Sequence, residues 1–282
     1  MFTQTTEMTK EFFLESDMAA PQQSSFPEGR VVSFCRRCPE KFEPNDDSAA
    51  IIRTVSGAIV LAVADGVGGG PLGYKASAIA VQALADRLWE SEPDRDLRPA
   101  ILDGIEQANR EILDLGVGAA TTLSVVEICD SVARAYQVGD SMTVIMGQRG
   151  VVKWKSTPHS PVGYAIESGL LDEVDAMHHD ERHLVSNLVG SREMHIEIGP
   201  SQPLSPRDTV VVGSDGLFDN LHLDEVIQLS RSGTPISRVT QLASMVHHRM
   251  TGDEIALSND ATSSQAEPLG KPDDLSILLY TK

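Results

Sequence analysis

The sequence predicts an α+β fold in which two antiparallel sheets are covered by helices. Three observations lead to this fold class. Strand patterns and paired helical patterns follow one another in blocks, short turns separate the strands between residues 121 and 155, and no regular strand–helix alternation runs through the chain. Short connections favour antiparallel hairpins, whereas a doubly wound parallel sheet needs a helix between successive strands.

The sequence predicts a flexible N-terminal tail over residues 1–28 and one ordered domain over residues 29–282. The tail is polar and without hydrophobic periodicity, and its segment 21–25 (PQQSS) is typical of a loop.

The first half of the domain combines two strands and two helices. A strand is expected over residues 48–53. A second strand, residues 58–64, is apolar throughout, which indicates burial on both faces, and Asp65–Gly66 ends it. Apolar residues at helical spacing predict helices over residues 76–88 and 97–115.

The second half begins with a block of strands and ends with a single strand. The block covers residues 121–128, 133–138, 142–147 and 151–155. Residues 157–182 are irregular, and a strand over 209–214 ends at Asp215–Gly216. Helices over 223–230 and 236–250, a polar loop over 251–270 and a strand over 275–280 follow.

Composition narrows the classes of function. The formal net charge is −18, from 23 basic and 41 acidic side chains. Nucleic acids and anionic membranes attract basic surfaces, so neither is an expected partner. The longest apolar run, residues 58–64, is far shorter than the about 20 residues of a transmembrane helix. Without an export signal and with only three cysteines, we expect reduced thiols and a cytoplasmic protein.

Several aspartates lie where predicted strands begin or end. In chain order they are Asp46, Asp47, Asp65, Asp140, Asp215 and Asp273. Strand ends in a layered fold can converge on one rim, where bare carboxylates repel one another and their pKa values rise. Divalent cations remove this repulsion, and all-oxygen ligands favour magnesium or manganese. The sequence therefore predicts a divalent metal site at such a rim.

An Asp–Gly pair alone is more typical of an ordinary turn. Asp103–Gly104, inside the second predicted helix, has no expected chemistry and serves as a comparison. Only the strand-end position distinguishes Asp65–Gly66 and Asp215–Gly216 from it. Glycine at position 66 also lets the backbone approach an ion and offer its carbonyl.

Five short motifs carry a family resemblance. They are Asp65-Gly66-Val67-Gly68-Gly69, Gly118-Ala119-Ala120-Thr121-Thr122, Gly139-Asp140-Ser141, Ser214-Asp215-Gly216-Leu217-Phe218-Asp219-Asn220 and Asp273-Asp274-Leu275-Ser276. In this order they resemble the metal-dependent type 2C protein phosphatases, the PPM family, and most of all its compact single-domain members. The resemblance covers residues 45–282, nearly all of the chain except its tail.

The resemblance implies a PPM-type domain over residues 29–282, folded as a four-layer α-β-β-α sandwich of two antiparallel sheets flanked by helix pairs. A site for two manganese or magnesium ions would lie at one edge. By motif position Asp65 would bridge both ions, Gly66 would give its carbonyl to one, and Asp215 and Asp273 would bind the other. Asp65, Asp215 and Asp273 are therefore the expected catalytic residues.

The resemblance also assigns the remaining acids. Asp46 and Asp47 match an acidic pair that holds metal directly or through water. Asp140 matches an aspartate that binds a weaker third ion, and Asp274 is expected to support the site.

The implied activity is hydrolysis of phosphoserine and phosphothreonine. Two ions that share a water lower its pKa, and the bridging hydroxide attacks phosphorus in line, so no phosphoenzyme is expected. The implied partner is a phosphorylated protein, opposed by a serine/threonine kinase. The protein is expected to be a monomer.

The chain departs from the family at two positions near the site. Val67 stands where some relatives have a histidine proposed as the acid for the leaving group. Phe42 stands where many eukaryotic relatives have a phosphate-binding arginine, a role left open to Lys41, Arg37 or Arg36. Residues 157–171 match a mobile flap that selects substrates, although an ordinary surface loop explains them equally well.

Two other classes of function remain as alternatives. Gly139-Asp140-Ser141-Met142 also matches the Gly-Asp-Ser motif of one esterase class, with Asp180 and His183 as triad partners, but that reading leaves the other strand-end aspartates unexplained. The second alternative is a catalytically silent PPM-like binding or regulatory protein. Intact Asp65, Asp215 and Asp273 argue against it, because a decayed site usually loses a ligand.

Overall fold

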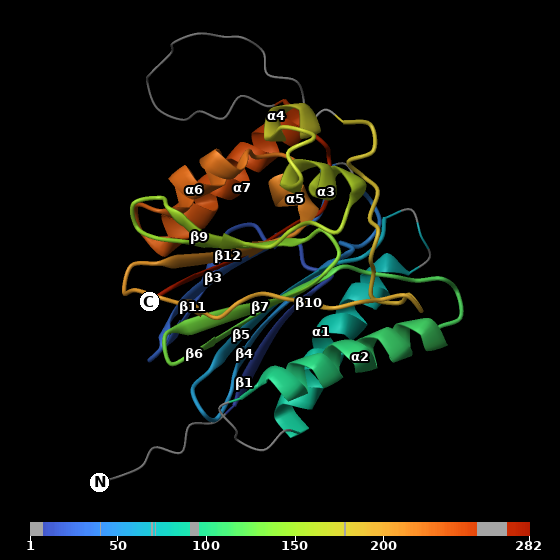
Figure 1. Cartoon of the computed structure of the whole chain (residues 1–282), viewed down its shortest axis with the longest axis horizontal. Helices are drawn as coiled ribbons and strands as arrows, with labels where there is room; N and C mark the ends of the chain where they lie inside the picture. Colours follow the sequence, from blue (N-terminus) through green and yellow to red (C-terminus); the bar gives the residue numbers. More distant parts are fainter. Residues whose placement is uncertain are drawn as a thin grey trace.

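The elements of the computed structural model form four layers (Figure 1). Two sheets face each other in the middle. Helices α1 (Gly73–Glu90) and α2 (Arg98–Asp114) cover one outer face, and α6 (Leu223–Ser230) and α7 (Pro235–Thr251) cover the other. The predicted α-β-β-α order is confirmed. The structure describes residues 8–39, 41–68, 70, 72–90, 96–177, 179–252 and 270–282.

The first sheet has seven strands, all paired antiparallel, in the order β1-β4-β5-β6-β7-β10, with β11 also pairing β7. Strand β5 is buried along almost its whole length, as its unbroken apolar run predicts. The strands are β1 (Thr9–Leu14), β4 (Asp47–Arg53), β5 (Ile59–Asp65), β6 (Leu123–Cys129), β7 (Val132–Val138), β10 (Glu197–Ile198) and β11 (Gln202–Pro203).

The second sheet has six antiparallel strands in the order β2-β3-β13-β12-β8-β9. Its centre pairs the last strand of the chain with strands from distant parts of the sequence. The strands are β2 (Gln22–Phe26), β3 (Gly29–Arg36), β8 (Met142–Met146), β9 (Val152–Lys155), β12 (Thr209–Gly213) and β13 (Leu275–Thr281).

Three apolar layers hold the sheets and helices together. Leu84 and Ile105 belong to the layer between the helices α1 and α2 and the first sheet. Leu61 and Val212 belong to the layer between the two sheets, and Val239 to the layer beneath α6 and α7. Each sheet is therefore apolar on both faces, which explains the continuous rather than alternating hydrophobic runs of the central strands.

The prediction of a flexible tail over residues 1–28 is wrong for the part that the structure describes. Strand β1 pairs with β4 over Thr9–Leu14, and β2 pairs with β3 over Gln22–Phe26. Both are edge strands, so each needs only one hydrogen-bonded neighbour and keeps many side chains exposed. A polar segment such as QQSSF can meet that requirement without an apolar pattern. Residues 1–7 lie outside the described part.

The irregular segment expected over residues 157–182 contains two short helices, α3 (Pro161–Glu167) and α4 (Glu173–Ala176). Ser160 caps α3 by accepting a hydrogen bond from the backbone N–H of Gly163, and Asp172 caps α4 in the same way. Such brief helices depend on their caps and leave little periodicity to detect. Most of the predicted polar loop over 251–270 lies outside the described residues.

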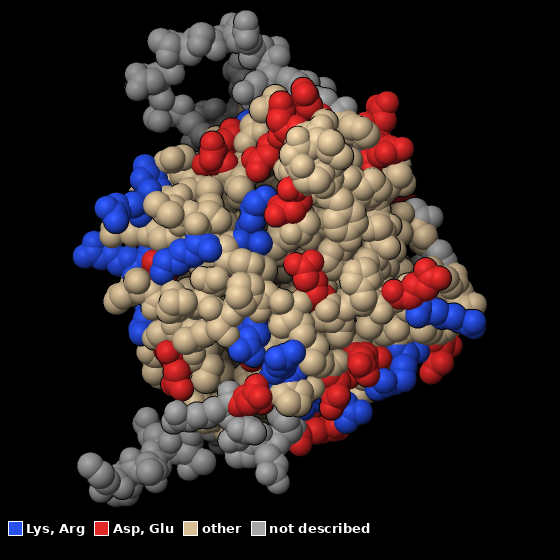
Figure 2. Space-filling model, in the orientation of Figure 1, with Lys and Arg blue, Asp and Glu red and all other residues tan. Residues whose placement is uncertain are grey.

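Two surface features bear on the predicted partners. No helix in the described ranges combines the length and the apolar character needed to cross a bilayer. Figure 2 shows basic side chains along the left edge of this face and, mixed with acidic ones, across its lower part and right edge, whereas the upper part is mainly acidic. The face carries no continuous basic surface of the kind that nucleic acids require.

The structure assigns a packing role to Gly104, which had no expected chemistry. A Cβ atom at this position would lie 2.9 Å from the Leu84 Cα and 3.2 Å from its Cδ1, so the glycine allows α1 and α2 to approach closely. Alanine in a helix normally stabilises by about 1 kcal/mol relative to glycine. At position 104 the steric clash of the added methyl group with Leu84 outweighs the gain in helix propensity.

We therefore expect Gly104→Ala to lower the free energy of unfolding by about 1–3 kcal/mol, measured by urea denaturation. The control is Asp103→Ala, at the neighbouring exposed position of the same helix, which should change it by less than about 0.5 kcal/mol. An unchanged or higher stability of Gly104→Ala would show that the two helices can separate without cost.

Candidate metal centre

The register of the first sheet brings Asp47 and Asp65 side by side. Asp47 is the first residue of β4 and Asp65 the last of β5, and the two are directly paired across the antiparallel ladder. Directly paired residues project from the same face of a sheet with neighbouring side chains. The two predicted ligands, eighteen positions apart in the sequence, therefore meet at one sheet end.

The second sheet supplies Asp215 and Asp273 at its own strand ends. Asp215 begins the short helix α5 (Asp215–Phe218) directly after β12, and Asp273 precedes β13. The two strands are paired, and the Ser214 N–H donates to the Ser276 carbonyl at 3.1 Å just beyond the ladder. A Cβ on Gly216 would lie 1.9 Å from the carbonyl oxygen of Asp274, so only glycine allows these two segments to come so close.

The Thr–Thr and Gly–Asp–Ser motifs support Asp65 and bring in Asp140. The Thr121 hydroxyl donates to the Asp65 carbonyl at 2.8 Å, and the Asp65 N–H donates to the Thr122 hydroxyl oxygen at 3.0 Å. Thr122 also shares a hydrogen bond of 2.6 Å with Ser141. The turn between β7 and β8, which carries Asp140, is thereby fixed against the end of β5.

The electrostatic environment shows that these carboxylates lie close enough to interact. Burial raises the pKa of Asp65 well above its ordinary value, and the charges of Asp215, Asp47, Asp273 and Asp140 raise it further. This set joins the ends of both sheets and the β7–β8 turn in one acidic cluster. We call these five residues the carboxylate cluster.

Burial and neighbouring negative charges also raise the pKa values of other members of the carboxylate cluster. Burial raises the pKa of Asp47, and the charge of Asp274 adds to it. Burial and then Asp215 raise the pKa of Asp140. Burial, again followed by Asp215, raises the pKa of Asp273 to about 6. Each shift means that the ionised cluster is costly as long as no cation compensates it.

Asp46 and Asp274 lie beside the cluster and share one lysine. The Lys41 ammonium bridges their carboxylates, at 2.7 Å from Asp46 Oδ2 and 2.6 Å from Asp274 Oδ2. Asp274 also accepts hydrogen bonds from the backbone N–H groups of Cys38 and Asp46, each at 2.7 Å. These contacts agree with the supporting role expected of Asp274.

Gly66 occupies a place that a side chain cannot enter. Its N–H donates to the Asp46 carbonyl at 3.1 Å, and a Cβ would lie 2.2 Å from the Gly73 carbonyl oxygen and 2.8 Å from that of Asp46. The glycine is thus needed for the close approach of three segments beside Asp65. Its predicted role as a carbonyl ligand remains a prediction.

A lysine ammonium also lies against the second-sheet half of the cluster. Lys271 Nζ is 2.6 Å from Asp215 Oδ2, 2.9 Å from Asp273 Oδ2 and 3.1 Å from Asp219 Oδ2. Among the residues that the structure describes, no group of three or more His, Cys, Asp or Glu side chains is arranged as a preformed metal site. Two lysines provide the compensating charge in this structure.

The donors nevertheless fit hard divalent cations. The Asp47 side chain is 1% exposed, and neither of its carboxylate oxygens has a hydrogen-bond partner; Asp215 Oδ1 is likewise buried and unpartnered. Buried carboxylate oxygens are rarely left unsatisfied, because their desolvation costs several kcal/mol. Unpartnered oxygens that converge from several strand ends are the donor set that magnesium and manganese prefer.

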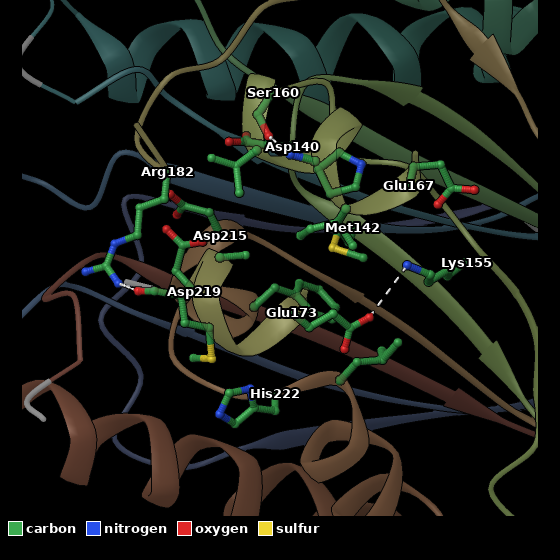
Figure 3. A pocket seen from close by; sticks show the side chains of 18 of the residues that line it. Asp140, Met142, Lys155, Ser160, Glu167, Glu173, Arg182, Asp215, Asp219 and His222 are labelled. Atoms are coloured by element: carbon green, nitrogen blue, oxygen red, sulfur yellow. Dashed lines mark hydrogen bonds and ion pairs between the residues drawn. The ribbon is translucent and has the colours of Figure 1, made fainter. Parts of the chain in front are cut away.

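A hollow that is open to solvent adjoins the cluster (Figure 3). Asp140 and Asp215 line it at one side, together with Asp219 and Arg182, and Lys155 and Glu173 lie on the other, with their charged groups 4.0 Å apart. Apolar side chains from β8, α3, α4, α5 and the residues from α5 to the start of α6 line the rest. They include Met142, Val162, Ile166, Ala176, Phe218, Leu221 and Leu223.

The two positions that depart from the family pattern differ in exposure, and Val67 is half-buried. Phe42 is 93% exposed and does not replace the missing arginine. Of the three basic residues considered for that role, Lys41 faces the site through Asp46 and Asp274, whereas Arg37 pairs with Asp17 at 3.6 Å.

The esterase alternative fails on geometry. The Ser141 side chain is completely buried and bonded to Thr122, whereas Asp180 and His183 are exposed. A nucleophile needs a base within hydrogen-bond reach and access to substrate, and Ser141 has no such access.

Sequence reasoning missed two residues of the site. Asp219 is 22% exposed and directly follows the short helix α5, which begins at Asp215; partial burial, followed by the Asp215 charge, raises its pKa to about 7. Its position four residues after Asp215, on the same face of a helical turn, was a usable signal. Lys271 lies outside helices and strands between Gly270 and Pro272, where nothing in the sequence marks it.

Comparison with known proteins agrees with this geometry. The family profile "Protein phosphatase 2C" matches residues 36–251. The serine/threonine phosphatase stp of Listeria monocytogenes is 26% identical over 204 residues, which cover 68% of this chain and 80% of that protein. The protein phosphatase PhpP of Streptococcus pneumoniae is 27% identical over 221 residues, which cover 74% and 88%.

Solved structures share the fold. The serine/threonine phosphatase of S. agalactiae superimposes with a TM-score of 0.73 at 23% identity, covering 89% of this chain and 98% of that one. The catalytic domain of the phosphatase PstP, in complex with two manganese ions, gives a TM-score of 0.70 at 19% identity and covers 89% and 97%. The strand-end aspartates, the motifs that support them and the profile that spans most of the chain lead to one conclusion: this chain belongs to the protein phosphatase 2C family.

Proposed function

We propose that the protein removes phosphate from phosphoserine and phosphothreonine in other proteins, by in-line attack of a hydroxide that bridges two manganese or magnesium ions. The observation that carries the proposal is the buried carboxylate cluster, which includes unpartnered oxygens of Asp47 and Asp215. Membership of the protein phosphatase 2C family supports it. The bound ions would supply an activated water and would neutralise charge on the phosphoryl oxygens.

The cluster's residues would divide the work of holding these ions. We assign Asp65 and the Gly66 carbonyl to the ion nearer the first sheet, and Asp65, Asp215 and Asp273 to the one nearer the second. Asp47 and Asp46 would complete the first position, directly or through water. Asp140, at the edge of the hollow, would serve a weaker third ion.

The hollow beside the cluster gives a place for the substrate polypeptide. A phosphoresidue at Asp140 and Asp215 would direct its neighbours along the apolar wall formed by α3 and α4 (Figure 3). The α3 part of this wall belongs to the segment 157–171, which we interpret as a substrate-selecting flap, and α4 follows directly after it. We therefore propose that phosphoproteins with a large apolar residue beside the phosphorylated side chain are preferred. The expected cytoplasmic location, monomeric state and opposing kinase are part of the same proposal.

Removal of a predicted ligand should abolish most of the activity. We expect Asp65→Asn and Asp273→Asn each to lower kcat/KM for an aryl phosphate with manganese by about 10²–10³-fold or more, because one charged donor is lost from the transition-state environment. Asp103→Asn, at an exposed helix position, is the matched control. Near-normal turnover of either ligand variant would remove that residue from the site. If wild-type protein binds manganese but hydrolyses no phosphate ester, the silent binding role replaces the enzymatic one.

Metal should stabilise the native state. A ligand that binds only the folded protein adds about 2.7 kcal/mol at a hundred times its dissociation constant. We expect millimolar manganese to raise the melting temperature in calorimetry, and a chelator to reverse the rise and to abolish activity. The melting temperature of the Asp65→Asn protein should rise much less on addition of manganese. Identical melting curves with and without manganese would contradict a metal site at the cluster.

The apolar wall should influence phosphopeptides more than small substrates. We expect Ile166→Ala to lower kcat/KM about tenfold for a phosphopeptide with an adjacent leucine, since the lost methylene contacts exist only with that side chain. The loss on an aryl phosphate should be smaller. Leu170→Ala, at an 85% exposed position of the same segment outside the hollow, is the control. Equal losses on both substrates would reject the wall as a peptide contact.

A further inference from the structure

The Lys271 ammonium is surrounded by carboxylates as a bound cation would be. Its three acceptors are single Oδ2 atoms of Asp215, Asp273 and Asp219, at 2.6, 2.9 and 3.1 Å. The ammonium donates hydrogen bonds to Asp215 and Asp219 and forms an ion pair with Asp273, so three carboxylates compensate one positive charge. The side chain is only 21% exposed, which makes the contacts part of the interior rather than a surface ion pair.

Two of these acceptors are the predicted ligands of the second ion. Asp215 and Asp273 come from different segments, one at the start of α5 and one before β13, and Lys271 is their common partner. Asp273 Oδ1 already accepts the backbone N–H of Asp274 at 2.9 Å. An ion that binds this pair must therefore share, or take over, the oxygens that hold the ammonium.

The charge of Lys271 is secured by its surroundings. A lysine ammonium is ordinarily charged at neutral pH, and three carboxylates surround this one at 2.6–3.1 Å. A divalent ion would thus meet a permanent positive charge on the same carboxylates. Two cations in contact with one set of oxygens repel each other strongly where water is largely excluded.

We propose that Lys271 is a tethered counter-cation that stabilises the ion-free second metal position and weakens ion binding there. The proposal rests on the proposed two-ion function. By linkage, any group that stabilises the ion-free state more than the loaded state lowers the apparent affinity for the ion. Lys41 has no equal effect on this position, because its ion-pair partners are Asp46 and Asp274 rather than Asp215 and Asp273.

The test is manganese binding by isothermal titration calorimetry, with wild-type protein, Lys271→Gln and Lys271→Arg. We expect Lys271→Gln to bind its weaker manganese ion at least about tenfold more tightly than wild type. It should also melt at a lower temperature without metal, because the carboxylates are no longer compensated. Lys271→Arg keeps the charge and should remain near the wild-type affinity.

Lys153→Gln is the matched control for loss of a partly buried ion pair. Lys153 pairs with the buried Asp208 at the β9 side of the second sheet, outside the carboxylate cluster. Its loss should lower the melting temperature and leave manganese affinity unchanged. A merely structural role of Lys271 would give the same result as this control and would overturn the proposal, as would weaker manganese binding by Lys271→Gln.

A second measurement needs only the wild-type protein and stays valid if Lys271→Gln does not fold. Brief acetylation followed by peptide mass spectrometry should show Lys271 reacting several-fold faster in manganese than in chelator, with Lys153 unchanged, because the ion releases the ammonium. Equal or slower reaction of Lys271 despite bound manganese overturns the inference alone. Wild-type protein that binds no manganese overturns the proposed function together with the inference.

Discussion

The repulsion between buried carboxylates is the constraint on which this structure depends. Both sheets end at one rim of the molecule. Each sheet places aspartates at this rim, next to the end of an apolar strand. Ionised carboxylates in such a place are stable only when cations or hydrogen-bond donors compensate them. The apolar layers on both sides of each sheet provide the stability that allows the rim to carry this cost. Lysines and divalent ions are two solutions to the same electrostatic problem.

Much of the fold could be predicted because its central strands are apolar on both faces. Residues 59–64 and 210–212 form unbroken hydrophobic runs, and the aspartates of the site follow shortly after each run. The edge strands β1 and β2 could not be found in this way, since their stability comes from backbone pairing with a neighbour that the sequence does not reveal. The need for glycine at position 104 could not be predicted either, because it comes from the close contact with Leu84 in another helix.

For the site, too, residues marked by a local sequence pattern could be predicted, whereas residues defined by a distant partner could not. Asp65 and Asp215 stand at strand ends and could be named from local pattern, and the paired register of Asp47 with Asp65 gives that pattern its physical basis. The partner of a charged group is a non-local property. Lys271 lies 56 positions from Asp215 and has no local signal, so only the three-dimensional arrangement reveals it.

Charge balance also bears on how an anionic substrate reaches an acidic protein. The chain carries a net charge of −18, and the basic side chains near the hollow are already engaged: Lys155 with Glu173, Arg182 with the Met177 carbonyl, and Lys271 with three aspartates. Phe42 supplies no charge where relatives have arginine. A phosphoryl group would therefore find its main electrostatic attraction in the divalent ions themselves. Metal loading should then govern substrate binding as well as the chemical step, because the same ions that compensate the carboxylates are what makes the rim attractive to phosphate.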